Sequence, residues 1–370
     1  MFPSRLVSVI GKGAFENNYS LEFDGTDDAV AIGDVTTYDN LTSFTVAFWI
    51  KRDGYGSANR NIVFGKDNQI ECAIKDTVNE LTLAVGNDFQ QFGVELADAT
   101  WTHIAMTFVG NGGSGNDTRK LYVDGSLSAT NTSGAITNSA TGSDSLTLGA
   151  RSASSNHTPA NIAEVAIWDT IISSSKISEL YQAKGTSDLN DDSNSANLQG
   201  WWRMGDGTLD SHPLIADQVN PTLGSEIASS LNWNNNGTSP YETFTSSGNV
   251  VSEAINTGWG IVYTDDFSLT SGNSYKVRYN LTLNSGVVPD FAKVSRNDSL
   301  DAGTDFSGVP VNGINTHYFR CSDSQSDFKF GFRLNGTTDW SLSDLSIKPV
   351  NGNPGIMTNM ASDDIVKDTP

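Results

Sequence analysis

The sequence is short of positive charge and of long apolar runs. In 370 residues it has 22 basic side chains against 43 acidic ones, a net charge of −21 at pH 7. Such a charge repels phosphate backbones and anionic lipid headgroups, so we expect no nucleic-acid partner and no binding to membrane surfaces. No apolar run approaches the roughly 20 residues that a membrane-spanning helix needs. The apolar stretch 6–10 is also too short for the core of a signal peptide, so we expect neither membrane insertion nor signal-directed export.

Cysteine and histidine are also scarce. Cys72 and Cys321 lie far apart in the sequence, and the four histidines are scattered. This distribution favours two buried thiols over a disulfide, and it argues against a zinc site or a catalytic triad. The sequence contains no GxSxG motif and no phosphate-binding loop.

Helical periodicity is rare, whereas alternation of apolar and polar residues is common. The alternating runs are short and are separated by Gly, Asn, Asp and Ser, a pattern typical of antiparallel sandwiches and barrels. The clearest runs are 43–51, 275–283 and 328–334. Asp124-Gly125 predicts a type I′ hairpin, because both central residues of this turn need positive φ. One helix is expected at 174–184, with Gly185 as its left-handed stop.

These patterns predict an all-β protein with two antiparallel β-sandwich (jelly-roll) domains and one short helix in the first. The expected division is an N-terminal arm (1–18), a first sandwich (19–206), a linker (207–237), a second sandwich (238–350) and a C-terminal tail (351–370). In the final strand the alternation slips by one residue at Ser343-Asp344, which indicates a β-bulge. Both terminal segments lack a core pattern, so we expect them to be held only by the domain surface or by a partner.

Six segments of the first domain form an ordered series. They are 19–28 (YSLEFDGTDD), 44–51 (FTVAFWIK), 101–108 (WTHIAMTF), 121–125 (LYVDG), 162–168 (IAEVAIW) and 177–181 (ISELY). Together they resemble the laminin-G-like domains of the concanavalin A-like lectin/glucanase family, and the resemblance implies a jelly-roll fold. The family often has Asp-Glu-Val where this chain has Ala163-Glu164-Val165, so acidic ligands are not carried over to that strand.

In the second domain, the segments 269–278 (LTSGNSYKVR) and 342–347 (LSDLSI) are similar to those of jelly-roll carbohydrate-binding modules. The pairing of two such domains, the segment 201–205 (WWRMG) and the absence of an export signal resemble virion proteins of tailed bacteriophages. This resemblance implies location in the virion, with capsid or tail proteins and host surface glycans as partners. A homo-oligomer is expected, with a trimer as its form, because virion appendages follow closed symmetry. Many copies would turn weak glycan contacts into avidity.

Trp259 is the candidate for stacking on a sugar. Gly258 and Gly260 flank it and favour an exposed indole, and Asn256 and Tyr263 supply polar groups close by in the sequence. Sandwich proteins bind glycans by packing an apolar sugar face on an exposed ring and by fixing the hydroxyls with polar side chains. Trp259, Tyr263 and Asn256 are therefore the predicted glycan site. The alternative is that Trp259 belongs to the core, as a tryptophan in a β domain usually does.

Acidic loops make Ca²⁺ the one cofactor expected. This ion prefers six to eight oxygen ligands, which loops at the rim of a sandwich can supply. The first candidate loop contains Asp24, Asp27, Asp28 and Asp34, and the second contains Asp298, Asp301 and Asp305. The run 188–199 imitates an EF-hand loop, but Ser193 and Gln199 replace its glycine and its bidentate glutamate. The alternative is that these Asp and Asn residues only build turns.

Catalysis is not expected. Retaining glycosidases use two carboxylates about 5 to 5.5 Å apart, and Glu22 and Asp24 have the sequence spacing of such a pair. No third acidic residue follows on this strand, and Asp24-Gly25 lies where the resemblance places a turn. We therefore predict a non-enzymatic virion protein with weak glycan-binding sites. The alternatives are a decoration protein without a ligand, a bacterial surface lectin and a glycoside hydrolase.

Overall fold

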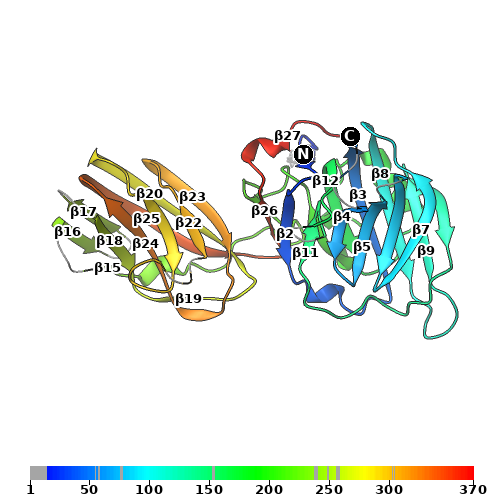
Figure 1. Cartoon of the computed structure of the whole chain (residues 1–370), viewed down its shortest axis with the longest axis horizontal. Coiled ribbons are helices and arrows are strands. Elements are labelled where there is room, and N and C mark those ends of the chain that lie inside the picture. The colour runs from blue at the N-terminus through cyan, green and yellow to red at the C-terminus, as the bar shows by residue number, and fades with distance from the viewer. Residues whose placement is uncertain are drawn as a thin grey trace, which may run out of the picture. The chain divides into compact units, whose positions relative to one another are not determined.

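The computed structural model describes residues 15–370 except 55, 57–58, 76–77, 152–154, 237–240, 248–249, 256–258, 302 and 304. The described residues form an all-β protein, as predicted, with antiparallel strands in four sheets and a single α-helix (Figure 1). None of the described helices is long and apolar enough to cross a membrane. The chain divides into unit 1 (Met1–Val219 with Met357–Pro370) and unit 2 (Asn220–Ile356). In chain order, unit 2 is therefore inserted into unit 1.

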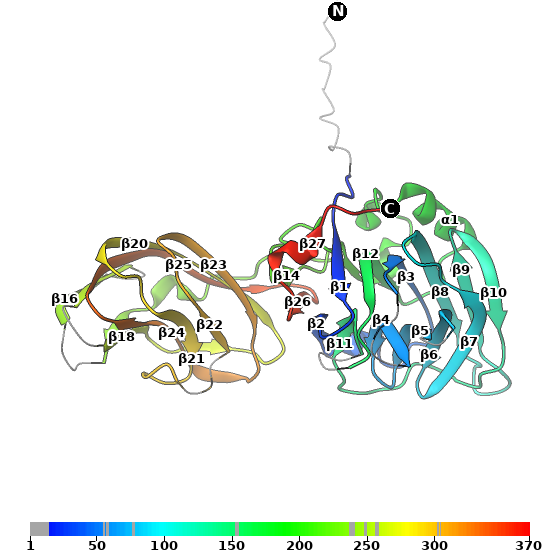
Figure 2. The same ribbon diagram turned by 45° about the horizontal axis from the view of Figure 1, so that its top comes forward.

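Unit 1 is a sandwich of two sheets, which we call sheet A and sheet B (Figure 2). From edge to edge, sheet A consists of β10 (Ser126–Asn131), β9 (Thr118–Val123), β8 (Trp101–Val109), β3 (Ser43–Arg52), β12 (Pro159–Trp168), β1 (Ser20–Asp24) and β27 (Ile365–Val366), and β13 (Leu198–Trp202) also pairs with β12. Sheet B consists of β14 (Leu214–Ile215), β26 (Gly355–Thr358), β2 (Ala29–Gly33), β11 (Leu146–Leu148), β4 (Arg60–Lys66), β5 (Ile70–Lys75), β6 (Glu80–Val85) and β7 (Asp88–Glu95). One apolar core includes inward-facing residues of both sheets, among them Phe44 of sheet A and Leu83 of sheet B.

The outer face of sheet A is covered by helix α1 (Ser174–Ala183). The Ser173 side chain caps the helix by accepting a hydrogen bond from the backbone N–H of Lys176, at 3.1 Å. Ile177 and Leu180 of the helix belong to a second apolar cluster, which also contains outward-facing residues of β3, β8, β12 and β13. The helix is predicted correctly, but the left-handed conformation begins one residue before Gly185, at Lys184 with φ 49°.

Short 3-10 helices lie between the strands, at Thr36–Tyr38, Leu189–Asp191, Ser195–Asn197, Ala228–Ser230 and Ser362–Asp364. The predicted type I′ turn is confirmed, because Asp124 and Gly125 have φ of 48° and 76° and join β9 to β10. Its geometry follows from the demand for two positive φ values, which Asp and Gly meet at low cost.

Unit 2 is a second sandwich, with sheets C and D. Sheet C consists of β15 (Trp233–Asn235), β18 (Trp259–Thr264), β24 (Gln325–Asn335), β21 (Phe291–Ser295) and β22 (Phe306–Gly308), and β19 (Phe267–Leu269) also pairs with β24. Sheet D consists of β16 (Tyr241–Ser247), β17 (Val250–Ile255), β25 (Thr338–Val350), β20 (Ser274–Gly286) and β23 (Gly313–Arg320). The strong alternation of 275–281 and 328–334 is confirmed, since the apolar members of both runs are buried in one core. The predicted bulge is also present, with Asp344 at φ 57° beside a register shift between β20 and β25.

The C-terminal tail expected at 351–370 is instead part of the unit 1 sandwich. Strand β26 lies between β14 and β2 in sheet B, and β27 extends sheet A beside β1. Met357 and Met360 are buried in the unit 1 core. Strands of two and four residues are too short to show a period, so alternation in the sequence does not reveal them.

The segment 207–237, expected to be a linker, is divided between the two units. Leu214 and Ile215 are fully buried in unit 1, whereas Leu231 and Trp233 belong to the unit 2 core. The described end of the N-terminal arm lies on unit 1. The ring of Phe15 stacks on Trp201, with centroids 5.7 Å apart.

Candidate functional site

The outer face of sheet B holds a pocket beside an exposed aromatic ring. Ile70, Cys72 and Ile74 of β5 point into the core, and strand alternation turns the residues between them, such as Ala73, outward. The strand pairing places Thr82 of β6 opposite Ala73. It also places Arg60 of β4 opposite Lys75 of β5, and Gln91 of β7 opposite Thr82. Outward side chains from four neighbouring strands therefore form one surface.

We call this the sheet B pocket. It has a volume of about 330 Å³ and is lined by Asn59, Arg60, Lys75, Thr82, Phe89 and Gln91. Phe89 is 40% exposed, and the Arg60 guanidinium carbon lies 3.8 Å from the centre of its ring. Strands β5 and β6 separate the strands that carry these two side chains. The Arg60–Phe89 pair therefore reaches across the sheet, which explains why Thr82 is nearly inaccessible on an outer face.

Polar groups surround the exposed ring of Phe89. The Gln91 amide is assigned the orientation that satisfies both its atoms: its nitrogen then donates to Oε2 of Glu80 at 3.1 Å, and its oxygen accepts from Nζ of Lys75 at the same distance. These contacts fix the amide and the ammonium group relative to each other. An aromatic ring beside fixed donors and acceptors is the combination that recognises the apolar face and the hydroxyls of a sugar.

A buried carboxylate holds the guanidinium group of Arg60 in place. Glu71 is 2% exposed and pairs with Arg60 at 3.5 Å and with Arg151 at 2.8 Å. Burial raises the pKa of Glu71, and the opposite charges of Arg151 and Arg60 oppose this rise. Glu71 thus positions the side chains of Arg60 and Arg151, and it is not among the residues that line the pocket. The described lining residues include no carboxylate, and their side chains are of the kinds that bind a sugar.

Sequence reasoning missed this pocket. Its residues come from four strands that pair only in the folded sheet, so no local motif brings them together. The available signal was the run Phe89-Gln-Gln-Phe92 after Gly86-Asn87, which indicates a further hairpin with Phe89 and Gln91 on one face.

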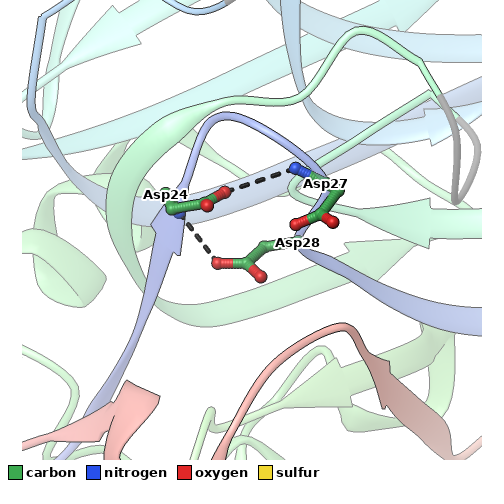
Figure 3. Close-up of side chains that lie close together, drawn as sticks. All are labelled: Asp24, Asp27 and Asp28. Carbon is green, nitrogen blue, oxygen red and sulfur yellow. Dashed lines mark hydrogen bonds between the residues drawn. The ribbon is translucent and has the colours of Figure 1, made fainter.

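The first acidic loop brings three of its four predicted carboxylates together. Ligand oxygens of Asp24, Asp27 and Asp28 all lie within 4.8 Å of one another, at the turn between β1 and β2 (Figure 3). Asp24 accepts hydrogen bonds from the backbone N–H groups of Thr26 (2.7 Å) and Asp27 (3.3 Å). Asp28 accepts one from the backbone N–H of Asp24, at 2.9 Å. These bonds are those of a turn, and the same oxygens are also of the hard type that Ca²⁺ prefers.

Two carboxylates of this cluster have pKa shifts in opposite directions. Burial works against ionisation of Asp24, but the backbone hydrogen bonds from Thr26 and Asp27 outweigh it and lower the pKa of this carboxyl. Asp28 is 5% exposed, and burial followed by the nearby charges of Asp24 and Asp364 raises its pKa to about 6. A cation at this position would remove the repulsion that disfavours the charged form of Asp28.

The structure does not bring the fourth predicted ligand, Asp34, into this cluster. Its carboxylate pairs instead with the buried ammonium of Lys66 at 2.8 Å, because strand β2 separates Asp34 from the β1–β2 turn. The other calcium candidates are engaged in protein contacts. Asp301 accepts from Asn297, Asp305 accepts from Ser322, and Asp192 of the EF-hand-like run pairs with Lys176. Within the described part of the chain, Asp24, Asp27 and Asp28 form the only acidic group close enough to share an ion.

The predicted glycan site around Trp259 is described only in part. Asn256 and the side chain of Trp259 lie outside the described residues, while the Trp259 backbone begins β18. Val262 points into the unit 2 core, so its neighbours Ile261 and Tyr263 point away from it. Tyr263 is half-buried, and burial together with the nearby charge of Asp298 raises its pKa.

Other described carboxylates bear on the question of catalysis. Glu22 is exposed on β1, but the Asp24 carboxylate is occupied by the turn. Glu164, whose pKa burial raises to about 7, accepts from the indole of Trp201 and the guanidinium of Arg203, both at 2.8 Å. His103 and Glu164 both line a small cavity of about 30 Å³.

Comparisons with known proteins found a family model that matches part of unit 1. Residues 24–178 match the model of the concanavalin A-like lectin/glucanases superfamily, and the match lies wholly within unit 1. The search of curated proteins found no match. Similar solved structures include a Bacteroides ovatus protein described as carbohydrate binding, with 17% identity and a TM-score of 0.44. The alignment covers 55% of this chain and 56% of the Bacteroides ovatus chain, so this chain spans little more than half the length of that protein.

Two further similar structures are at comparable identity. A heptameric SAP-like pentraxin from Limulus polyphemus is 16% identical, with a TM-score of 0.36 and coverage of 45% of this chain and 82% of that one. Domain 4 of a GH43 arabinanase from Geobacillus stearothermophilus, solved with arabinotriose, is 17% identical, with a TM-score of 0.34 and coverage of 44% and 76%. The match of residues 24–178 to the superfamily model agrees with the sequence resemblance, and unit 1 is a two-sheet sandwich, as the all-β prediction requires.

Proposed function

We propose that this protein binds glycans without cleaving them, and that the sheet B pocket is a main binding site. The observation that carries this proposal is the side chain of Phe89, 40% exposed beside a pocket of about 330 Å³ with polar groups around it. Monomeric proteins can expose single apolar side chains without a function. Here Arg60 holds the ring from one side, and Gln91 and Lys75 hold each other, so the site is organised before any ligand arrives.

The mode of binding follows from the lining residues. The free part of the Phe89 ring packs against the C–H groups of a pyranose, and Asn59, Gln91 and Lys75 bond its hydroxyls. The absence of a carboxylate among the described lining residues supports the part of the proposal in which the bound sugar keeps its glycosidic bond. The size of the pocket suits one or two sugar units, because sites for drug-sized ligands have about 300–1,000 Å³.

The test compares Phe89→Ala with wild type on a glycan array, followed by calorimetry with the best ligand. We expect Phe89→Ala to weaken binding at least tenfold, which corresponds to about 1.4 kcal/mol. Leu127→Ala is the matched control, because Leu127 is 54% exposed on sheet A of the same unit. Absence of binding by wild type, or equal losses in both variants, contradicts the proposal. Sugar release that disappears in Glu22→Gln would show a hydrolase instead.

The biological setting is a separate part of the proposal. We infer that the protein acts in the virion of a tailed bacteriophage, attached to capsid or tail proteins, and that it binds host surface glycans in several copies. The support is the sequence resemblance alone, together with the gain that many weak sites give through avidity. Electron microscopy of particles labelled with an antibody to this chain tests the location. Labelling on neither head nor tail would overturn the virion role and favour a bacterial lectin.

A further inference from the structure

A second pocket lies on the outer face of sheet C in unit 2. It has a volume of about 240 Å³ and is lined by Ile261, Phe291, Lys293, Ser299, Leu300, Asp301 and Arg333. The strand pairing explains its floor. Arg333 of β24 is opposite both Ile261 of β18 and Phe291 of β21, so these three side chains form one outward row across three strands. Their neighbours Val262, Ala292 and Phe332 are buried in the core on the other face.

One wall of this pocket is the loop after β21. Leu300 is fully buried although it belongs to a loop, and it packs where Gly331 of β24 leaves space on the sheet. A Cβ at position 331 would lie 2.5 Å from the backbone oxygen of Val262 and 2.7 Å from Cδ1 of Leu300, so this close packing requires glycine. Nζ of Lys293 donates to the carbonyl of Leu300 at 3.1 Å, and the backbone N–H of Asp301 donates to the side chain of Asn297 at 3.0 Å. The loop is therefore fixed against the sheet.

Two cations flank a single ring in this pocket. Nζ of Lys293 lies 4.2 Å from the centre of the Phe291 ring, and the guanidinium carbon of Arg333 lies 5.6 Å from it. Among the described residues, neither cation has an ion pair with a carboxylate. Two nearby cationic side chains differ in this respect: Lys329 of β24 and Arg296, which follows β21, each pair with two aspartates. In a chain with 43 acidic side chains, two cationic groups without such a partner indicate a site for an external anion.

These groups have unused capacity to bind an anion. An ammonium group has three donors and a guanidinium has five, and the guanidinium can bind a carboxylate through two parallel hydrogen bonds. Lys293 uses one donor on Leu300, and Arg333 is exposed at the mouth of the pocket. Asp301 is the one acidic lining residue, and its carboxylate accepts from the Asn297 amide at 2.6 Å. Asp301 therefore offers an acceptor for a hydroxyl of the ligand.

We propose that this pocket is a second binding site, specific for an acidic sugar residue. The carboxylate or sulfate group lies between Lys293 and Arg333, the sugar ring packs on Phe291, and Ser299 and Asp301 bond its hydroxyls. The volume is below the about 300–1,000 Å³ of sites for larger ligands, so the pocket takes one residue of a chain. The site is in a different unit from the sheet B pocket and does not depend on it.

The test uses calorimetry of the full chain with three probes: a galacturonate trisaccharide, a sulfated galactose trisaccharide and the uncharged galactose trisaccharide. We expect a charged probe to bind and Arg333→Gln and Lys293→Gln each to raise its Kd at least tenfold. Binding should weaken between 50 and 300 mM NaCl, because the attraction is between charges near the surface. Phe291→Ala provides a variant without a charge change and should weaken binding of the same probe.

The control for the charge change is Lys276→Gln, because Lys276 lies in β20 of the other sheet and contacts Tyr318. It should change the Kd less than twofold. Phe89→Ala should leave the charged probe bound, which separates this site from the sheet B pocket. The proposal is overturned if neither charged probe binds, if the uncharged probe binds as tightly, or if Lys276→Gln weakens binding as much as Arg333→Gln. Preference for one charged probe identifies the anion as carboxylate or sulfate.

Discussion

Replacing Met357 by alanine tests whether the C-terminal strands are part of the unit 1 core. Met357 is 5% exposed, and its side chain lies in the same apolar cluster as residues of both sheets. Its backbone N–H donates to the carbonyl of Pro213 at 2.7 Å, which ties β26 to the chain next to β14. The strand is thus held by packing on one face and by backbone hydrogen bonds at its edges.

The size of the expected effect follows from this burial. A buried Met→Ala change costs about 2–5 kcal/mol, because it removes apolar contacts and leaves a cavity. Methionine is flexible and its loss can be partly compensated by neighbours such as Met360, so we expect about 3 kcal/mol. For a unit of about 150–250 residues, 1 kcal/mol shifts Tm by about 2–4 °C. The unit 1 transition should therefore fall by about 6–12 °C.

Differential scanning calorimetry measures the shift, and hydrogen exchange assigns it to a unit. Peptides from β2, which neighbours β26, should lose protection, while peptides from β20 in unit 2 should not. Leu127→Ala is the control, because this exposed side chain should leave Tm within about 1 °C of wild type. A Met357→Ala protein with unchanged Tm and unchanged β2 protection would refute the reasoning, since residues 351–370 would then be a surface tail.

Two further predictions concern buried charges in unit 1. The pKa of Asp28 is raised from 3.8 to about 6 in the folded protein, so the folded state favours the protonated carboxyl. The stability that comes from this proton is fully present below about pH 4 and is lost as pH rises through 6. Allowing for solvent screening, Asp28→Asn should raise the unfolding free energy of the calcium-free protein at pH 7.5 by about 1–2 kcal/mol and remove this pH dependence. Stabilisation of the wild-type protein by Ca²⁺ should appear only above about pH 6. Stabilisation by Ca²⁺ that persists at pH 5 would contradict this prediction. Arg119 is fully buried and pairs with Asp117 at 3.0 Å and Asp88 at 2.7 Å, so Arg119→Met should cost about 3–5 kcal/mol in urea unfolding. The control is Lys51→Met, which breaks a solvent-accessible pair with Asp368 and should cost less than about 1 kcal/mol.

Much of the fold could be predicted because local pattern and global burial agree. The alternation of 275–281 places Tyr275 and Val277 on one face, and both are buried in unit 2. Asp124-Gly125 could be assigned a turn type from backbone sterics alone. The insertion of unit 2 could not be predicted. It depends on β26 and β27, which are recognised only through pairing with strands far away in the sequence, such as Leu21 with Ile365.

The candidate sites, too, could be predicted where their residues are close in sequence and not where strand pairing brings them together. Asp24, Asp27 and Asp28 lie within five residues of one another, so one turn brings them together and the sequence predicts the cluster. Asp34 lies beyond a strand, and only the folded sheet decides that it pairs with Lys66. The sheet B pocket and the sheet C pocket are both made by side chains in register across several strands. Single-sequence reasoning favours a residue with conspicuous neighbours, such as Trp259 between glycines, and overlooks sites that need strand pairing.

The insertion of unit 2 into unit 1 also affects the order in which the two units can fold. Unit 2 begins and ends at neighbouring points, because the backbone N–H of Asn351 donates to the carbonyl of Thr222 at 3.0 Å and that of Gly224 to Pro349 at 2.8 Å. Its core can therefore form without any residue of unit 1. Unit 1, in contrast, receives its last two strands only after unit 2 has been synthesised, and these contacts join residues 348 positions apart, as between Ser20 and Asp368. Contacts of such separation form slowly, because the loop between them must close first. An inserted unit that folds by itself shortens this loop, since the ends of unit 2 then already lie side by side.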